Sequence, residues 1–323
     1  MGFCVPAPVV SQQTLQGLQY FRLLGPWFDH LHRVGTARDR AGNRQLFYDQ
    51  YATLLLVYFF NPTVTSLRGL QQTTTLAQVQ TQLGIRRTSL GALSEAASVF
   101  DAALLHHVLT SLSTQLRPHL PGADQAALAA LTAVDGSLLP ALPRMLWAVW
   151  QDEQHRAAKM HVAFAVFRQG PVGVTVTAGN ASERAELRRL VQPGGFYVFD
   201  RGYIDYELFQ ELHDLPCSFV GRVKANVAYE VQEERPLPDA AQAAGVQRDV
   251  VLRRLGTAHH TRLLPHPFRL VQVATGKTDA QGTPEVLVLV TNRLDLDADL
   301  VALAYKYRWA VELFFRWVKC VLG

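Results

Sequence analysis

Three acidic residues of this chain, Asp135, Asp200 and Glu312, are the ones best suited to chemistry. Asp135 and Asp200 each end an apolar run that has the pattern of a buried strand. A strand end holds a carboxylate rigidly at the edge of the sheet, where open α/β sheets form their sites. If the two strands are neighbours, both aspartates come within reach of one metal ion. Taken alone, the Asp135-Gly136 pair is more often a turn or a helix cap.

Glu312 lies in an aromatic-rich segment, residues 305–319, which we expect to form part of one final helix from Asp299 to Val321. At about 100° per residue, its polar side chains fall in one narrow stripe, and most of its remaining surface is apolar. The pattern predicts a helix that buries most of itself and directs one carboxylate, among several cations, at a site. The stripe consists of Tyr305, Arg308, Glu312, Arg316 and Lys319.

This combination of residues indicates phosphodiester chemistry. Carboxylate oxygens favour Mg²⁺ or Mn²⁺ over Zn²⁺. Two such ions activate a water or a 3′-hydroxyl and stabilise the leaving oxygen. The basic residues beside them, Arg308 and Lys319, would bind the flanking phosphates. Arg201 and Tyr203, next to Asp200, either contact DNA or order the loop that carries this aspartate.

The spacing of these residues resembles that of a known family. Tyr305-x2-Arg308-x3-Glu312-x6-Lys319 resembles the YREK signature of the IS-four family of DDE transposases from bacterial insertion sequences. The resemblance covers about residues 44–323. Three further motifs are similar to the segments around the first aspartate, around the second aspartate and before the glutamate: Val134-Asp135-Gly136-Ser137, Asp200-Arg201-Gly202-Tyr203 and Thr291-Asn292-Arg293.

The resemblance implies a catalytic triad of Asp135, Asp200 and Glu312 that holds two Mg²⁺ or Mn²⁺ ions. It also implies that Tyr305, Arg308 and Lys319 hold the DNA of the transposon end. The implied activity is cut-and-paste transposition, in which the element's ends are nicked and the 3′-hydroxyl attacks target DNA. The implied partners are double-stranded DNA, as terminal inverted repeats and as target, and a second copy of the chain when DNA is bound.

Relatives in this family can stack a tryptophan of a β insertion on a flipped base during hairpin formation. This chain has no tryptophan between Trp150 and Trp309, so Tyr229 or Phe268 would have to take that place. Family members also usually continue past the lysine with further helix, whereas four residues follow Lys319 here. We therefore expect a truncated or frame-interrupted copy, or one part of a split gene.

Two other functions fit the same residues. A catalytically inactive, truncated remnant would fold and bind DNA without transferring strands. An RNase H-like nuclease unrelated to mobile elements would keep the three carboxylates but would not need the stripe of tyrosine, arginine and lysine.

The periodicity of apolar residues predicts the elements that position these side chains. Residues 1–125 form a helical N-terminal region with a possible DNA-binding helix-turn-helix around 75–100, although a glycine between two helices is common in all-α domains. Residues 126–223 form the first part of the catalytic core, which the family resemblance implies is RNase H-like, and residues 224–285 form a β-rich insertion. Residues 286–323 return to the core as its last strand and the glutamate-bearing helix. The expected fold class is therefore α/β, with a mixed sheet that follows an all-α region.

Composition sets wider bounds. A hydrophobic content of 49% in 323 residues predicts a globular protein with a real core, and a net charge of +4 permits a polyanionic partner without requiring one. The three cysteines lie far apart, which indicates reduced thiols in a cytosolic protein. The longest apolar run, Tyr51–Phe60, is too short to cross a membrane. We expect a cytoplasmic, nucleoid-associated bacterial protein.

Overall fold

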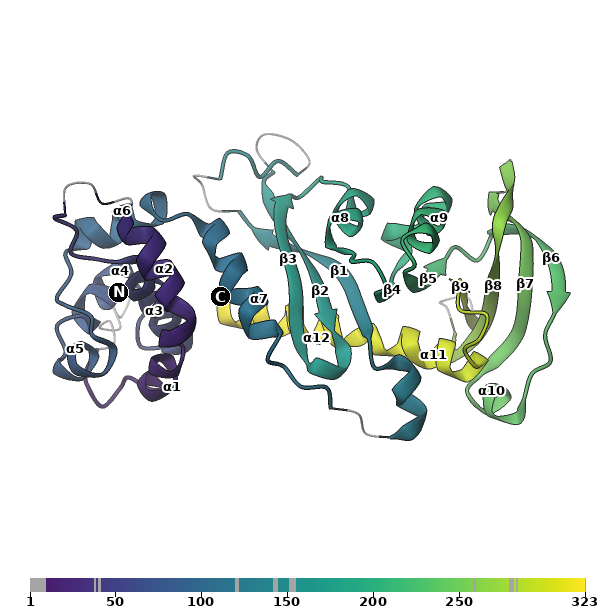
Figure 1. Ribbon diagram of the computed structural model, residues 1–323, viewed down its shortest axis with the longest axis horizontal. Coiled ribbons are helices and arrows are strands. Elements are labelled where there is room, and N and C mark those ends of the chain that lie inside the picture. The colour runs from purple at the N-terminus through teal and green to yellow at the C-terminus, as the bar shows by residue number, and fades with distance from the viewer. Residues whose placement is uncertain are drawn as a thin grey trace, which may run out of the picture. The chain divides into compact units, whose positions relative to one another are not determined.

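The computed structural model describes residues 10–37, 39, 42–119, 122–141, 145–150, 155–257, 260–278, 282 and 284–322. The chain divides into two compact units. One consists of residues 1–114 with 318–323, and the other of residues 115–317. Figure 1 shows the first unit as helices and the second as a twisted sheet with helices on its faces.

The first unit is helical, as the sequence predicts. Helix α3 contains the apolar run 51–60 and buries Leu54 and Val57 completely. None of the helices in the described ranges is long and apolar enough to span a membrane. The elements are α1 (Leu18–Leu23), α2 (Gly25–Ala37), α3 (Tyr48–Phe60), α4 (Leu67–Thr73), α5 (Ala77–Leu83), α6 (Leu90–Val99), η1 (Ala102–Leu104) and α7 (Leu105–Ser113).

Helices α5 and α6 are joined by residues 84–89, within the segment for which a helix-turn-helix is expected. Gly84 ends α5 with a positive φ of 65°, a conformation that glycine adopts without strain. The side chain of Ser89 caps α6 by accepting a hydrogen bond from the backbone of Ala92 at 3.1 Å. Arg86 and Arg87 lie exposed in the connection that precedes α6.

The second unit alternates strands and helices. Its elements are η2 (Ala123–Leu128), β1 (Leu131–Pro140), β2 (Ala157–Ala165), η3 (Val166–Arg168), β3 (Gly170–Ala178), α8 (Glu183–Leu190), β4 (Phe196–Phe199), η4 (Arg201–Tyr203), α9 (Tyr206–Asp214), β5 (Ser218–Val223), β6 (Ala228–Glu234), α10 (Asp239–Ala243), β7 (Val246–Thr257), β8 (His260–Thr278), β9 (Pro284–Thr291), α11 (Ala298–Tyr307) and the part of α12 (Trp309–Leu322) up to residue 317. The short helix α10 lies within residues 224–285, the insertion that is expected to be β-rich.

The nine strands of the described residues form one sheet, in the order β3-β2-β1-β4-β5-β9-β8-β7-β6. Strands β1, β4 and β5 run parallel to one another, and β2 runs antiparallel to both β1 and β3. This order and direction in the first five strands is the RNase H-like arrangement that the sequence predicts. Strands β6, β7 and β8 lie between β5 and β9 in the chain, yet they extend the same sheet beyond β9 (Figure 1).

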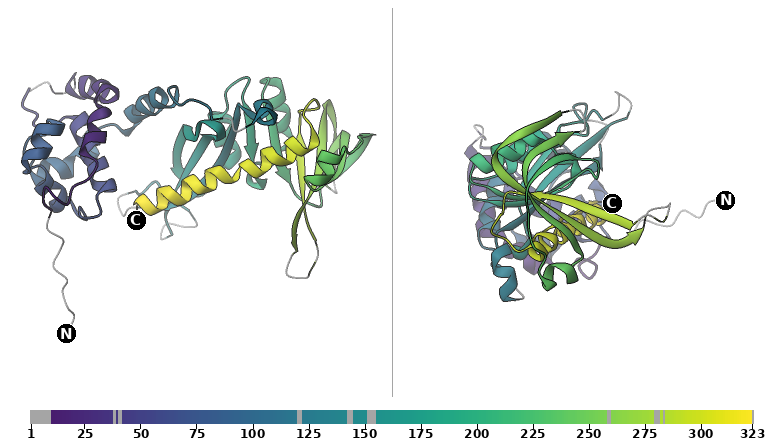
Figure 2. Two further views of the ribbon diagram at one scale, coloured as in Figure 1. Left: turned by 90° about the horizontal axis from the view of Figure 1, so that it is seen from below. Right: turned by 90° about the vertical axis from the view of Figure 1, so that its right-hand side faces the viewer.

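Helices cover both faces of this sheet (Figure 2). Helices α8 and α9 bury Leu187 and Phe209 against one face, together with Val134 of β1. Helices α11 and α12 bury Val301 and Val311 against the other face, together with Ala133 of β1. Since successive strand residues point to opposite faces, Asp135 points to the side of α12 and Gly136 to the side of α8.

The final helical segment differs from the single helix expected. Helix α11 ends at Tyr307 and α12 begins at Trp309, and around Arg308 two backbone bonds join residues three apart rather than four. The expectation that this segment buries most of itself was also wrong. Trp309, Leu313 and Trp317 form a stripe on α12 in which each side chain is about half exposed.

Candidate active site

The two aspartates are brought together by the register of β1 and β4. These strands pair in parallel from Leu131 opposite Phe196 to Val134 opposite Phe199, the residues that immediately precede Asp135 and Asp200. Strand β1 itself continues to Pro140 in its pairing with β2, so Asp135 does not end its strand as expected. What ends at this point is the pairing with β4.

A backbone amide orients each aspartate. The N–H of Gly136 donates to Oδ1 of Asp135 at 2.8 Å, and the N–H of Arg201 donates to Oδ1 of Asp200 at 2.7 Å. The hydroxyl of Tyr305 also donates to Oδ1 of Asp200 at 3.1 Å. One oxygen of each carboxylate is thus held by a neutral donor, and Oδ2 is left for a cation.

That cation is the guanidinium of Arg308. Its Nη1 donates to Oδ2 of Asp135 at 3.2 Å, and its Nη2 lies 2.5 Å from Oε1 of Glu312 and 4.0 Å from Oδ2 of Asp200. The last two oxygens therefore lie no farther apart than the sum of those two distances. One guanidinium contacts all three carboxylates, which come from β1, from the turn after β4 and from α12.

Burial and charge shift the titration of Asp135. Burial raises the pKa of this carboxyl to about 6, and the nearby charges of Glu312 and Asp200 act in the same direction. The hydrogen bond from Gly136 and the charge of Arg308 lower the pKa and offset only part of that rise. Asp135 therefore gains or loses its proton at a pH near 6, well above the range of an ordinary aspartate.

The donor set fits divalent metal ions of the Mg²⁺ class, because it offers carboxylate oxygens and no sulfur or imidazole. Within the described ranges, no three His, Cys, Asp or Glu side chains are already placed to hold a metal ion. Arg308 lies where the three carboxylates meet. A metal ion would have to replace this guanidinium as the partner of the carboxylate oxygens. The three carboxylates already converge on one cation, which supports their suitability as metal ligands.

The other stripe residues lie in different environments. Tyr305 is largely buried, with its hydroxyl engaged by Asp200, whereas Arg201 is exposed beside the site. Lys319 and Arg316 are exposed on α12. The three carboxylates, Arg308 and Tyr305 are thus in direct contact, and Lys319 belongs to a later turn of the helix.

Tyr203 does not fit the expected contact with DNA. Its side chain is 1% exposed and packs against Phe199 in the core beneath α8 and α9. A buried ring anchors the loop after Asp200, which is the alternative reading of this residue. Phe268 is likewise fully buried and cannot stack on a base, while Tyr229 is half-buried and its hydroxyl accepts a hydrogen bond from Arg248 at 2.9 Å.

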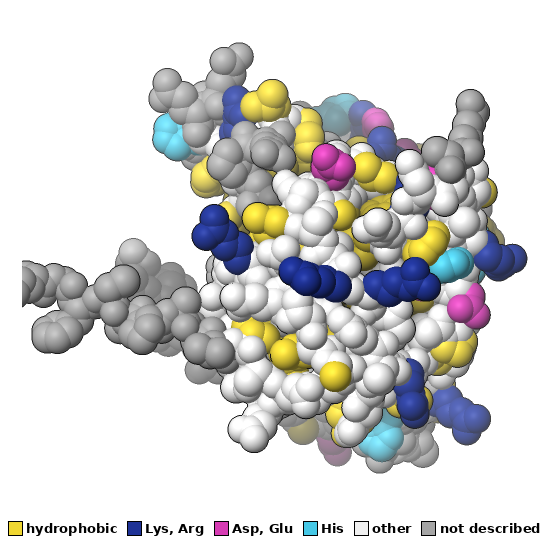
Figure 3. Space-filling view, turned by 90° about the vertical axis from the view of Figure 1, so that its left-hand side faces the viewer, with side chains coloured by type: hydrophobic (Ala, Val, Ile, Leu, Met, Phe, Trp, Pro, Cys, Tyr) yellow, Lys and Arg dark blue, Asp and Glu magenta, His cyan; other side chains and the backbone are white. Residues whose placement is uncertain are grey.

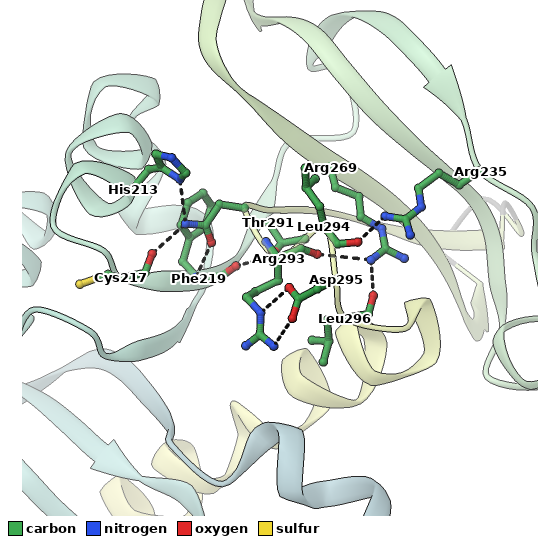
Figure 4. Close-up of polar contacts among 11 residues, drawn as sticks. His213, Cys217, Phe219, Arg235, Arg269, Thr291, Arg293, Leu294, Asp295 and Leu296 are labelled. Carbon is green, nitrogen blue, oxygen red and sulfur yellow. Dashed lines mark hydrogen bonds and ion pairs between the residues drawn. The ribbon is translucent and has the colours of Figure 1, made fainter.

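The motif Thr291-Asn292-Arg293 connects β9 to the helix that carries Tyr305. The side chain of Asn292 accepts a hydrogen bond from the N–H of Phe219 at 3.0 Å and donates to the carbonyl of Cys217 at 2.7 Å, so it acts as a strand partner for the start of β5. Figure 4 shows this set of contacts together with the turn that follows. The turn therefore has a fixed place on the sheet edge.

Arg269 of β8 holds the same turn from the other side. Its guanidinium donates to the carbonyls of Leu296 and Arg293 and forms two hydrogen bonds of 2.6 Å with the buried carboxylate of Asp249. Arg235 donates to the carbonyl of Leu294 at 2.6 Å (Figure 4). Sequence reasoning missed these residues, because they lie far apart in the chain and match no motif.

An RNase H-like sheet with three converging carboxylates is typical of enzymes that act on the phosphodiester bonds of nucleic acids. Residues 127–323 match the family described as the transposase DDE domain, which is more than half of the chain. The chain belongs to this family.

Two curated relatives are similar to this chain. One is a protein of Sinorhizobium fredii (strain NBRC 101917 / NGR234) named as the transposase y4zB, 28% identical over 193 residues, or 59% of this chain and 52% of the relative. The other is a protein of Geobacillus stearothermophilus named as the transposase of insertion sequence element IS5377, 31% identical over 184 residues, or 56% of this chain and 45% of the relative. The matched region spans about half the length of each.

Among solved structures, the chain is similar to the piggyBac transposase in a synaptic complex with hairpin DNA. The match has 10% sequence identity and a TM-score of 0.48, and it covers 96% of this chain and 70% of that one.

Proposed function

We propose that this protein is a DNA transposase of the YREK subgroup of the IS-four family, which nicks the ends of an insertion sequence and joins them to target DNA by cut-and-paste transposition. The observation that carries the proposal is the contact of Arg308 with Asp135, Asp200 and Glu312 in a member of the transposase DDE domain family. Asp135, Asp200 and Glu312 are the proposed ligands of two Mg²⁺ or Mn²⁺ ions.

The side chains have separate roles in this proposal. When bound, the two ions would activate the attacking water or 3′-hydroxyl and stabilise the leaving 3′ oxygen. Gly136 and Arg201 hold one oxygen of each aspartate with their backbone amides, and so aim the other oxygen at the centre. Tyr305 orients Asp200 from α11. Arg308 keeps the carboxylates together by charge, and its guanidinium becomes available for a DNA phosphate once they bind metal.

The helical unit is proposed to bind the DNA of the element's ends through α5 and α6. Residues 1–114 contain eight arginines and five acidic residues. Arg86 and Arg87 are exposed between the two helices. Figure 3 shows Lys and Arg side chains spaced over a largely uncharged polar surface with few acidic groups. The positive side chains of such a surface attract DNA phosphates, and because they are spread out the attraction is moderate. Lys319 and Arg201 are proposed as further phosphate contacts, and a DNA-bound homodimer in the bacterial nucleoid as the active assembly.

The test is nicking of duplex DNA by the full chain, on the terminal inverted repeats that flank its gene and on a shuffled duplex of equal length. We expect Mg²⁺-dependent nicking at the repeat ends, and a loss of at least about 100-fold in Asp135→Ala and Glu312→Ala. Full activity in either variant contradicts the mechanism. Equal cleavage of both duplexes identifies a general nuclease, and tight binding without nicking identifies an inactive DNA-binding remnant.

A further inference from the structure

An ion pair lies beneath the two aspartates, on the opposite face of the sheet from Arg308. Lys159 of β2 contacts Oε1 of Glu183, in the first turn of α8, through its Nζ. The side chains are 14% and 25% exposed, so this pair is better shielded from water than the surface ion pairs of the same unit. The two residues are 24 positions apart in the chain and take no part in the site described above.

Two glycines make room for this pair. A Cβ atom on Gly136, the residue after Asp135, would lie 2.9 Å from Cε of Lys159. A Cβ atom on Gly202, two residues after Asp200, would lie 1.8 Å from Oε2 of Glu183. Lys159 therefore lies directly against the Asp135 segment and Glu183 directly against the Asp200 loop.

The surrounding layer is polar where an apolar core would be expected. His161 is fully buried on β2, opposite Gly136 in the register, and its Nε2 lies 2.9 Å from the hydroxyl of Thr177. Glu186 of α8 is also buried and accepts a hydrogen bond from Thr175 at 3.0 Å. Among the described residues, Nδ1 of His161 and the hydroxyl of Tyr203 have no partner. Apolar packing would stabilise the fold at least as well, so charges retained here point to a positional role.

The place of the pair gives that role a physical basis. Pairing between β1 and β4 ends at Val134 and Phe199, so no strand pairing joins the backbones of the two aspartates beyond that point. Arg308 joins their side chains, but only while the carboxylates are not bound to metal. A link that acts from the other face holds the two segments in both states.

We propose that the Lys159–Glu183 ion pair is a positioning device that sets the separation of Asp135 and Asp200 for metal binding. It rests on the proposed function, in which these aspartates hold metal. In this proposal neither residue contacts DNA or the reacting atoms. Groups that orient metal ligands from behind typically change metal affinity or activity by about 10–100-fold when they are removed.

The experiment compares the full-length wild type with Lys159→Met and Glu183→Gln. Arg188→Gln is the matched control, because Arg188 makes an exposed ion pair from the same helix to Glu211. Mn²⁺ binding is measured by the electron paramagnetic resonance signal of the free ion. Single-turnover nicking is followed against Mg²⁺ concentration, affinity for end DNA is measured without metal, and thermal unfolding is measured on each variant.

We expect both pair variants to bind Mn²⁺ about 10–100-fold more weakly and to need correspondingly more Mg²⁺ for nicking. Metal-free DNA affinity should be unchanged in both, and Arg188→Gln should match the wild type. The charge reversal Lys159→Glu with Glu183→Lys should recover part of the lost affinity, which a general loss of packing would not. If Lys159→Met unfolds, the isosteric Glu183→Gln decides.

The outcomes separate this proposal from the proposed function. Unchanged Mn²⁺ binding in the folded variants, beside a wild type that binds the ion, overturns the positioning role alone. Weaker Mn²⁺ binding in the variants of a wild type that does not nick DNA supports the positioning role and overturns the transposase activity. A wild type that binds no Mn²⁺ overturns both.

Discussion

At the scale of the residue, Arg308 determines the charge state of the site. Three carboxylates lie around the guanidinium of Arg308. The guanidinium is largely shielded from water, whereas each carboxylate is partly exposed. Without a cation, three negative charges at this separation repel one another and raise the cost of folding. Arg308 therefore replaces some of the positive charge that metal ions would bring.

This arrangement predicts a specific response to Arg308→Met. In the presence of EDTA, the variant should be less stable by about 2 kcal/mol, below the ~3–5 kcal/mol for fully buried pairs because the carboxylates are partly exposed. Mg²⁺ should raise the melting temperature of the variant more than that of the wild type, since binding to the folded state alone stabilises it. Thermal unfolding over a range of Mg²⁺ concentrations measures both effects. An equal shift in both proteins would show that the ions do not bind at these carboxylates.

The raised pKa of Asp135 predicts two opposite effects of pH. The folded-state pKa, about 6, lies above the ordinary value of 3.8. The protonated form therefore stabilises the fold at low pH, and this stabilisation, at most about 3 kcal/mol, is lost as pH rises through about 6. In EDTA, Asp135→Asn should thus stabilise the protein more at pH 8 than at pH 5. Metal-dependent nicking by the wild type should instead fall as pH drops through about 6, because the metal binds the carboxylate.

The matched control for this effect is Asp295→Asn. The hydrogen bond from Arg293 lowers the pKa of the Asp295 carboxyl, so its contribution to stability is present at neutral pH and is lost on acidification. That loss takes place only below the ordinary pKa of 3.8, so Asp295→Asn should change stability by the same amount at pH 8 and at pH 5. Melting temperatures of both variants at the two pH values check the prediction, and a pH dependence in Asp295→Asn equal to that in Asp135→Asn would contradict it.

At the scale of the element, the site depends on how the segment after β9 is held. Asn292 pairs with the start of β5, and Arg269 and Arg235 bond the carbonyls of residues 293–296. Helix α11 begins directly after this turn and carries Tyr305 to Asp200. The strands between β5 and β9 therefore contribute to the site by fixing the origin of this helix.

The pair of Arg269 and Asp249 should be the most sensitive point of this connection, because both side chains are almost fully buried. Arg269→Met leaves the carboxylate of Asp249 buried with a weaker partner, and we expect a loss of about 3–5 kcal/mol in the free energy of unfolding. The paired change Arg269→Met with Asp249→Leu should recover much of this loss. Urea denaturation measures all three proteins, and exposed Arg248→Gln is the control. If Arg269→Met is as stable as the control Arg248→Gln, the prediction is wrong.

At the scale of the whole molecule, the chain combines a helical unit and an α/β unit, and the proposed function assigns DNA affinity to the first and chemistry to the second. If α5 and α6 bind the element's end, Arg86→Ala and Arg87→Ala should each weaken binding and lower the salt dependence of the affinity by about one charge. Fluorescence anisotropy with labelled end DNA at several salt concentrations measures both quantities. Arg248→Gln, in the other unit, is the control and should retain the wild-type salt dependence. If both arginine variants keep the wild-type salt dependence, the segment between α5 and α6 does not contact DNA.

The sequence by itself determined the features that depend on a few neighbouring residues. Ser182 caps helix α8, which runs from Glu183 to Leu190, and the sequence alone can carry such a feature because capping and helical periodicity act over a few positions. The three carboxylates were found for the same reason, since each follows or punctuates an apolar run. The alternation of elements predicted a mixed sheet with helices on its faces, and the family resemblance implied that this sheet is RNase H-like.

Only the tertiary structure decided how these pieces meet. Register placed Asp135 level with Asp200 although β1 continues beyond it, and packing under α8 and α9 buried Tyr203. Arg308 interrupts the final helix, and the exposed stripe on α12 reverses the burial that its composition predicts. The ion pair of Lys159 and Glu183 has no local signature at all. Contacts between residues far apart in the chain depend on register and on which faces are covered, and neither is written in the sequence of any one element.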